Sequence, residues 1–263
     1  MNRRPFLSLL LFFPILSWWI TAPKPQELQI AASGNIRDIM TEVARFAEAR
    51  NPMTKIKLFF GTAEEVARQI DSHASFDVYI GDQDDMDYLN DEGRLVEHPP
   101  IQLFMDQAVA VAPGDTDWDI TDAKQLTPDN VKKIALMHED TRWGAIGRDY
   151  LEKYGVLDAV KDKITDVKTL HGAIEAIKRG DAKWTIVTSS EAARRKNLKL
   201  LWKVPVTDIP GQTFSAARLT CSRNQELGAR ILAGLQSSIV RRMFENAGFQ
   251  LLTPPPDNRD PKK

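Results

Sequence analysis

The chain has 263 residues, of which 43% are hydrophobic and 27% are charged, and its formal net charge is −1. These proportions are ordinary for a folded globular protein, and the length allows one large domain or two lobes of about 100 residues each. A chain without a basic excess does not favour a nucleic-acid partner. The single cysteine, Cys221, excludes a disulfide framework and a cysteine metal cluster.

The first 22 residues differ in character from the rest. Arg3 and Arg4 precede a mostly apolar run over residues 6–20. A basic start followed by a short apolar core is typical of a secretory signal peptide. Pro23 follows directly and disfavours cleavage, so residues 1–22 are either a signal peptide or a retained N-terminal anchor. Both alternatives predict a periplasmic or other extracytoplasmic protein.

The next part of the chain alternates short apolar strands with amphipathic helices. Ser33 or Asn35 is expected to cap the first helix, and Thr62 opens the second as the start of a capping box with Glu65. A short helix follows around Met86. The elements expected here are strands over 27–32, 55–60 and 76–80, and helices over 36–47 and 63–70.

The middle of the chain continues the same alternation. A strand over 108–112 ends at Pro113 and is expected to cross into a second lobe. A strand over 214–220 returns the chain to the first lobe, where one long helix over 225–246 completes it. The elements expected in the second lobe are strands over 133–137, 183–188 and 198–204, and helices over 144–154, 169–179 and 191–196.

These elements predict an α/β fold of two lobes, each a mostly parallel sheet with helices on both faces, hinged around a ligand cleft. The first lobe comprises residues 27–107 and 207–252, and the second comprises residues 108–206. The tail over 253–263 is rich in proline and charge and is predicted to be disordered. Ligands of parallel sheets bind beyond the carboxyl ends of the strands, where the first N–H groups of helices favour an anion.

Several short pieces follow the order and spacing of one known family. They are Ala31-Ala32-Ser33, residues 65–70, 77–83, 86–89, 109–113, 144–155 and 186–188, and Ala247-Gly248-Phe249. In these pieces, spread over nearly the whole chain after the N-terminal segment, the sequence resembles the periplasmic molybdate-binding proteins of ABC importers. The resemblance implies a type II periplasmic binding fold and a partnership with the membrane subunits of an ABC transporter. We expect a monomer, with no cofactor or metal.

The resemblance also implies a site in which hydroxyls and backbone N–H groups hold a tetrahedral oxyanion such as molybdate or tungstate. Ser33 matches the family's first binding serine, and Thr62 falls in the turn of the second. Arg142 and Trp143 replace part of a turn that donates a backbone N–H, and Thr188 replaces a binding tyrosine. The predicted ligand-binding set is Ser33, Thr62, Ala63, Arg142, Trp143, Leu170 and Thr188.

Two departures from the family leave the ligand open. A carboxylate about 6 Å from a dianion costs roughly 5 kcal/mol at an effective dielectric near 20, so a molybdate site requires Glu64 to face solvent. Arg68, one helical turn on, can pair with it there. Arg142 beside Trp143 is either a clamp for the carboxylate or phosphate of an organic anion, or a surface arginine paired with neighbouring acidic residues, Glu139 or Asp140.

The sequence therefore predicts an extracytoplasmic solute-binding protein of an ABC importer. An enzyme is not expected, because no nucleophile or acid–base constellation is present, and no catalytic residues are assigned. The ligand is either an oxyanion or an organic anion. A further alternative is a divergent binding-protein fold that serves as an anchored accessory or sensor protein.

Overall fold

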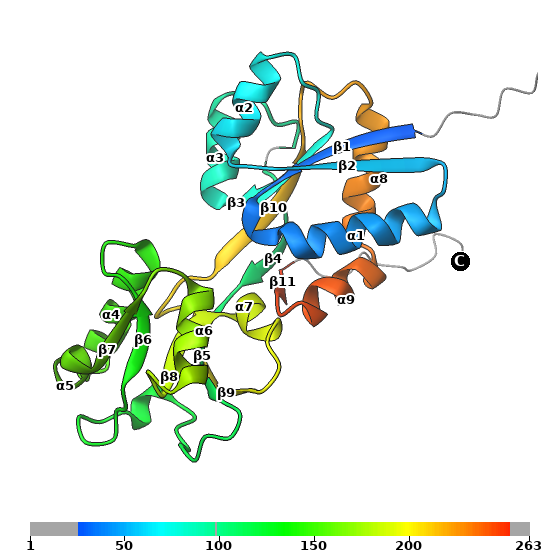
Figure 1. Ribbon diagram of the computed structural model, residues 1–263. Coiled ribbons are helices and arrows are strands. Elements are labelled where there is room, and N and C mark those ends of the chain that lie inside the picture. The colour runs from blue at the N-terminus through cyan, green and yellow to red at the C-terminus, as the bar shows by residue number, and fades with distance from the viewer. Residues whose placement is uncertain (1–25, 98, 253–263) are drawn as a thin grey trace, which may run out of the picture.

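The computed structural model describes residues 26–97 and 99–252, which form two lobes, one mostly blue, cyan and orange and the other green and yellow (Figure 1). The predictions for residues 1–22 and 253–263 lie outside the described residues. Within the described residues, none of the helices has both the length and the apolar character needed to span a bilayer.

The first lobe is built on a six-stranded sheet of order β11-β4-β10-β3-β1-β2. Because side chains alternate across a strand, Leu28 and Ile30 of β1 face a core with α1, α8 and α9, whereas Ala31 faces a core with α2 and α3. The strands are β1 (Gln26–Ala32), β2 (Thr54–Phe60), β3 (Val78–Asp82), β4 (Ile101–Asp106), β10 (Gln212–Arg218) and β11 (Gln250–Leu251). The helices are η1 (Gly34–Ile36), α1 (Arg37–Arg50), α2 (Ala63–Asp71), α3 (Gln83–Asp91), α8 (Gln225–Leu235) and α9 (Ser238–Asn246).

The second lobe is built on a five-stranded sheet of order β7-β6-β8-β5-β9. One of its cores contains Trp184 and Trp202, and the other packs Ile174 and Ile177 of α6 on Val187. The strands are β5 (Ala108–Pro113), β6 (Ile134–Met137), β7 (Ile164–Val167), β8 (Trp184–Thr188) and β9 (Leu198–Lys203). The helices are η2 (Ala123–Gln125), α4 (Arg142–Lys153), α5 (Leu157–Val160), η3 (Lys161–Lys163), α6 (Leu170–Arg179) and α7 (Ser189–Ala193).

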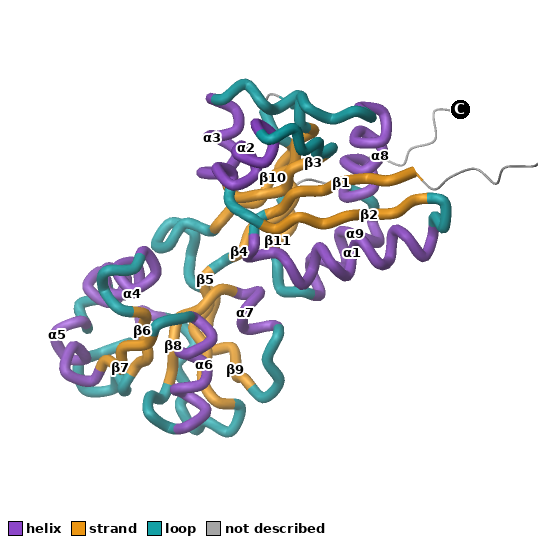
Figure 2. Tube along the Cα trace, turned by 45° about the horizontal axis from the view of Figure 1, so that its top comes forward, coloured by secondary structure: helices purple, strands orange, loops and turns teal. Residues whose placement is uncertain are grey.

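The two-lobed α/β fold is confirmed, but both sheets are mixed and not mostly parallel. β1 pairs in parallel with β2 and β3, whereas β10 runs antiparallel to β3 and β4. In the second sheet β6 is parallel to its neighbours, and β5 is antiparallel to β8 and β9. The antiparallel strands β5 and β10 each receive the chain from the other lobe (Figure 2), so no helical crossover fixes their direction.

The predicted helix over 225–246 is in fact two helices, α8 and α9. Ser237 adopts an extended conformation between them, and its side chain accepts a hydrogen bond from the N–H of Val240. The apolar spacing continues across this break, so periodicity alone did not show it. Strands β4 and β7 were not predicted either. β7 has only four residues and lies at the edge of its sheet.

Candidate functional site

A cleft of about 470 Å³ lies between the two lobes. The first lobe contributes the turn after β1 and one residue each from β4 and β10. The second lobe contributes the ends of β6 and β8 and the starts of α4, α6 and α7. The lining residues are Gly34, Asn35, Asp106, Met137, Trp143, Lys168, Thr169, Leu170, Thr188, Ser190, Glu191, Arg194 and Gln212. Three predicted residues, Trp143, Leu170 and Thr188, are therefore brought together.

A larger hollow of about 600 Å³ lies elsewhere, between the β5–β9 part of the second lobe and the segment from α9 to β11. None of the predicted site residues lines it. Because the cleft collects helix starts and strand ends from both lobes, it is the candidate site.

Ser33 lies next to the cleft, directly before Gly34, and is only 7% exposed. Its backbone N–H donates to the carbonyl of Ile80 at 2.8 Å, but its hydroxyl has no hydrogen bond to any residue that the structure describes. Neither Ser33 nor Asn35 caps the helix by its side chain, contrary to the prediction; Ile36 stands at the N-cap of α1. The Ser33 hydroxyl is not one of the buried side-chain atoms that lack a partner in the described part of the chain, so it keeps contact with solvent and is free to serve a ligand.

Thr62 forms the predicted capping box at the start of α2. Its side chain accepts from the N–H of Glu65, and its own N–H donates to the Glu65 carboxylate at 3.0 Å. Glu64 is exposed, as a molybdate site requires, and the hydrogen bond from Thr62 lowers its pKa. Thr62 is likewise exposed and is absent from the residues that line the cleft.

Ala63 cannot offer its N–H to a ligand in this structure. That N–H donates to the Asp85 carboxylate at 2.9 Å, and the other carboxylate oxygen accepts from the Tyr79 hydroxyl at 2.6 Å. Burial raises the pKa of Asp85 and, together with the Asp85 hydrogen bond, that of Tyr79. An internal carboxylate therefore occupies the start of α2, and the predicted donors Thr62 and Ala63 are not assembled with the others.

Thr188 lines the cleft, but its hydroxyl already has hydrogen-bond partners within the protein. Ser190 donates its hydroxyl to buried Asp106, so the Ser190 oxygen, 3.2 Å from that of Thr188, accepts the Thr188 proton. The Thr188 oxygen in turn accepts from the N–H of Glu191, as the cap of α7. A hydroxyl has one proton, so Thr188 has none left to donate to an oxyanion. Thr188, not Ser189 or Ser190, is thus the cap, which corrects the prediction for this helix.

Asp106 ends β4, where the chain passes into the second lobe. Besides Ser190, its carboxylate accepts from the Ser189 hydroxyl and from the N–H of Ser190, each at 3.0 Å. Sequence reasoning missed this residue because its partners lie 83 and 84 positions away. Asp106 fills the start of α7 as Asp85 fills that of α2.

Arg142 and Trp143 are the first two residues of α4, and their side chains have different surroundings. The Arg142 guanidinium lies 3.3 Å from the Asp84 carboxylate on α3 of the other lobe, and both side chains are largely exposed. The partner is neither Glu139 nor Asp140. Arg142 lines a neighbouring hollow of about 230 Å³, which shares Gln212 with the cleft. Trp143 is half-buried against the core of the second lobe and lines the cleft itself.

Leu170 begins α6, which Thr169 caps by accepting from the N–H of Gly172 at 2.9 Å. The N–H groups of Leu170 and His171 belong to the first turn and have no partner within the helix. Lys168, two residues before the helix, lines the cleft and has no ion pair or hydrogen bond among residues 26–97 and 99–252. Lys168 directly precedes the helix-capping residue Thr169, and this position in the sequence could have identified Lys168 as a site residue.

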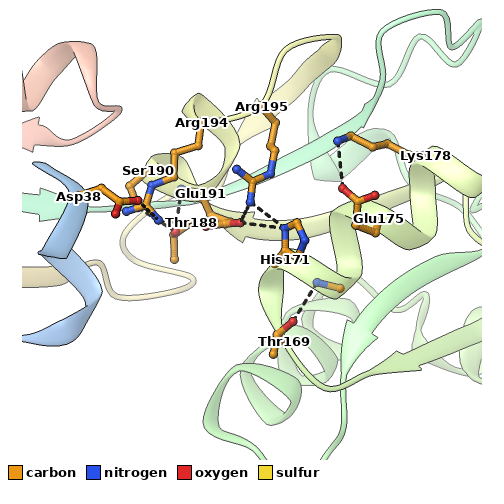
Figure 3. A network of polar contacts seen from close by, with 11 residues as sticks. Asp38, Thr169, His171, Glu175, Lys178, Thr188, Ser190, Glu191, Arg194 and Arg195 are labelled. Atoms are coloured by element: carbon orange, nitrogen blue, oxygen red, sulfur yellow. Dashed lines mark hydrogen bonds and ion pairs between the residues drawn. The ribbon is translucent and has the colours of Figure 1, made fainter.

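A network of charged groups borders the cleft (Figure 3). Arg195 lies 2.8 Å from Glu191 and 2.7 Å from Nδ1 of His171, so that nitrogen accepts. Arg194 lies 3.3 Å from Asp38 on α1 of the other lobe and 3.6 Å from Glu191. Arg194 therefore pairs with Asp38 and shares the Glu191 carboxylate with Arg195.

Within the described part of the chain, no three or more His, Cys, Asp or Glu side chains are placed to hold a metal ion. His138 precedes Glu139 and Asp140 in the chain, and among the ionisable groups described here it contacts only Asp140, at 3.2 Å. The donors available at the cleft are hydroxyl, amide and ammonium groups, which suit an anion.

Two lobes joined by two crossings, with helix starts facing a common cleft, define a solute-binding protein. The family model described as bacterial extracellular solute-binding protein matches residues 28–250. The chain belongs to this family, whose members are binding proteins that act outside the cytoplasm.

Individual relatives extend the comparison. YvgL of Bacillus subtilis, provisionally named an ABC transporter substrate-binding lipoprotein, is 23% identical over 86% of this chain and 87% of its own length. The molybdate-binding protein ModA of Haemophilus influenzae is 23% identical over 85% of this chain and 89% of its own length. The solved substrate-binding domain of a provisionally assigned molybdenum ABC transporter from Clostridium difficile has a TM-score of 0.77. It is 21% identical, covering 86% of this chain and 99% of that one. The resemblance to molybdate-binding proteins is thereby confirmed.

Proposed function

We propose that the protein is the extracytoplasmic substrate-binding component of an ABC importer and that it binds a small anion between its lobes. The names of its relatives, a substrate-binding lipoprotein and molybdate-binding proteins of such transporters, support the importer role. Membrane subunits of that importer are then its partners.

The main evidence for an anionic ligand is the environment of Ser33. Its hydroxyl lies beside the cleft, has no hydrogen bond to a described residue and is not sealed from solvent, so it can donate to a ligand that enters there. The first N–H groups of η1 and of α6 lie on opposite sides of the same cleft, and the dipole of α6 favours negative charge. Closure of the lobes would bring these donors around one anionic group.

The anion is either a free oxyanion such as molybdate or tungstate, or the charged group of an organic molecule. The relatives favour the first alternative. The second is favoured by Trp143 and Lys168, which line the cleft. No resident cofactor is required by either.

A thermal-shift screen of the purified protein against molybdate, tungstate, sulfate, phosphate and small carboxylates tests the proposal. A ligand at 100 times its Kd adds about 2.7 kcal/mol to the free energy of unfolding, which raises Tm by several degrees. The shift should be smaller in Ser33→Ala, by an amount that corresponds to a roughly 10- to 100-fold weaker Kd. A shift that is unchanged in this variant would show that Ser33 does not contact the anion and would contradict the proposed site.

A further inference from the structure

The donors of the cleft are distributed unevenly. The starts of α2 and α7 are occupied by Asp85 and Asp106, and the Thr188 hydroxyl is committed to Ser190. The unoccupied donors lie near Ser33 on one side and at the start of α6 on the other. A bare tetrahedral oxyanion is best held by donors on all sides, and this cleft does not surround it with them.

One part of the cleft wall is apolar. Met137, Trp143 and Leu170 are half-buried and line it together. An indole ring offers a large apolar face, which gains free energy by covering the carbon atoms of a ligand. A volume of about 470 Å³ also lies within the range of pockets that hold organic ligands. This wall indicates a ligand with an apolar body.

Two charged groups that line the cleft, Lys168 and Asp106, have no ion-pair partner among the described residues. Arg194, by contrast, pairs with Asp38 and Glu191. Asp106 is satisfied by the hydroxyls and the N–H of α7. A single negative group beside Lys168 and the N–H groups of Leu170 and His171 would give Lys168 the ion pair that it lacks.

We propose, building on the anion-binding cleft described above, that the ligand is an organic anion with one carboxylate or phosphate group and an apolar body. The charged group lies against Lys168 and the start of α6, and the body packs on Trp143 and Met137. Lys168 thereby determines specificity by selecting the charged group, and Trp143 by selecting the body.

Titration calorimetry of the purified protein with five probes tests this assignment. The probes are phenylacetate, phenyl phosphate, acetate, inorganic phosphate and molybdate. We expect phenylacetate or phenyl phosphate to bind at least 10-fold more tightly than acetate or inorganic phosphate respectively, because the small anions have no body to bury. Comparison of the two aromatic probes identifies the charged group.

Lys168→Met should weaken the aromatic probe roughly 10- to 100-fold, the usual value of a charge-assisted hydrogen bond. Lys163→Met removes the same charge from η3, away from the cleft lining, and should change the Kd less than about twofold. Trp143→Leu should weaken phenylacetate more than acetate, which a purely structural role of the tryptophan would not do.

If molybdate binds and neither aromatic probe does, this inference is wrong, but the proposal of an anion-binding cleft still holds. Equal affinity of Lys168→Met and Lys163→Met for the aromatic probe would overturn it as well. Silence toward all five probes would refute both this inference and the proposed function.

Discussion

The Asp85 carboxylate accepts the backbone N–H of Ala63 at 2.9 Å and so takes the position that an anionic ligand would need at the start of α2. The same carboxylate accepts from Tyr79, whose side chain is fully buried. The protein thus supplies its own anion at a helix terminus that the sequence offered as part of the ligand site.

Asp85→Ala should lower the free energy of unfolding by about 1–3 kcal/mol, because it leaves the Tyr79 hydroxyl and the Ala63 N–H without a partner. Asp85→Asn retains an acceptor for Ala63 and should cost less than about 1 kcal/mol at neutral pH. Urea denaturation of the two variants measures this difference. If both variants were equally unstable, the charge and not the hydrogen bonds would be what stabilises this site.

The raised pKa of Asp85 predicts a pH dependence of stability. Burial, its largest cause, disfavours the ionised form, so the native state binds this proton more tightly than the unfolded state does. The Asp85 contribution is therefore full below the ordinary carboxyl pKa and is lost as the pH rises through the raised pKa. Wild type should gain stability relative to Asp85→Asn as the pH falls through this window. Denaturation curves of the two proteins between about pH 3.5 and 7 measure the difference in their free energies of unfolding. The other carboxyl groups contribute equally to both proteins, so the difference reports on Asp85.

Ser33→Ala should weaken the ligand roughly 10- to 100-fold while leaving the stability of the unliganded protein nearly unchanged, because its hydroxyl bonds to no described residue. Thr62→Ala should show the opposite pattern. It removes a helix cap, at a cost of about 1 kcal/mol, and leaves the Kd within about twofold. Calorimetry and thermal melts of the pair distinguish the two roles. A loss of affinity in Thr62→Ala would show that the start of α2 contacts the ligand after all.

Asp106→Ala should destabilise the protein by at least about 2 kcal/mol, since Ser189 and Ser190 lose their shared acceptor where the lobes meet. Asp106→Asn should cost less, because its amide oxygen can still accept and the buried hydroxyls can reorient. Denaturation followed by tryptophan fluorescence checks this order. An Asp106→Ala variant as stable as wild type would mean that these contacts do not hold the crossing together.

Arg142→Gln should change stability by less than about 1 kcal/mol, because its contact with Asp84 is an exposed ion pair. The Kd for the ligand should stay within about threefold, since Arg142 lines the neighbouring hollow and not the cleft. Asp84→Asn is the matched control and should behave alike. A 10-fold loss of affinity in Arg142→Gln alone would show that Arg142 contacts the ligand after closure.

Local chemistry by itself determined much of this protein. The capping box at Thr62, the helix that ends before Gly180, whose φ is 83°, and the strand that ends at Ala32 follow from residues within one or two turns of each other. The order of these elements also predicted two lobes, and the resemblance of short sequence pieces to one family predicted the family. Periodicity did not predict the break at Ser237, because apolar residues recur on both sides of it.

Only the tertiary structure decided which of the offered donors remain available. Asp85 reaches Ala63 over 22 positions, Arg142 reaches Asp84 over 58, and Asp106 reaches Ser190 over 84. Each pairing depends on how strands are ordered and on how the lobes meet, and neither is encoded in local spacing. A hydroxyl that already donates to a partner cannot donate to a ligand. Ser33 and Thr188 both follow a strand and precede a helix, but the Ser33 hydroxyl has no described partner, whereas the Thr188 hydroxyl donates to Ser190.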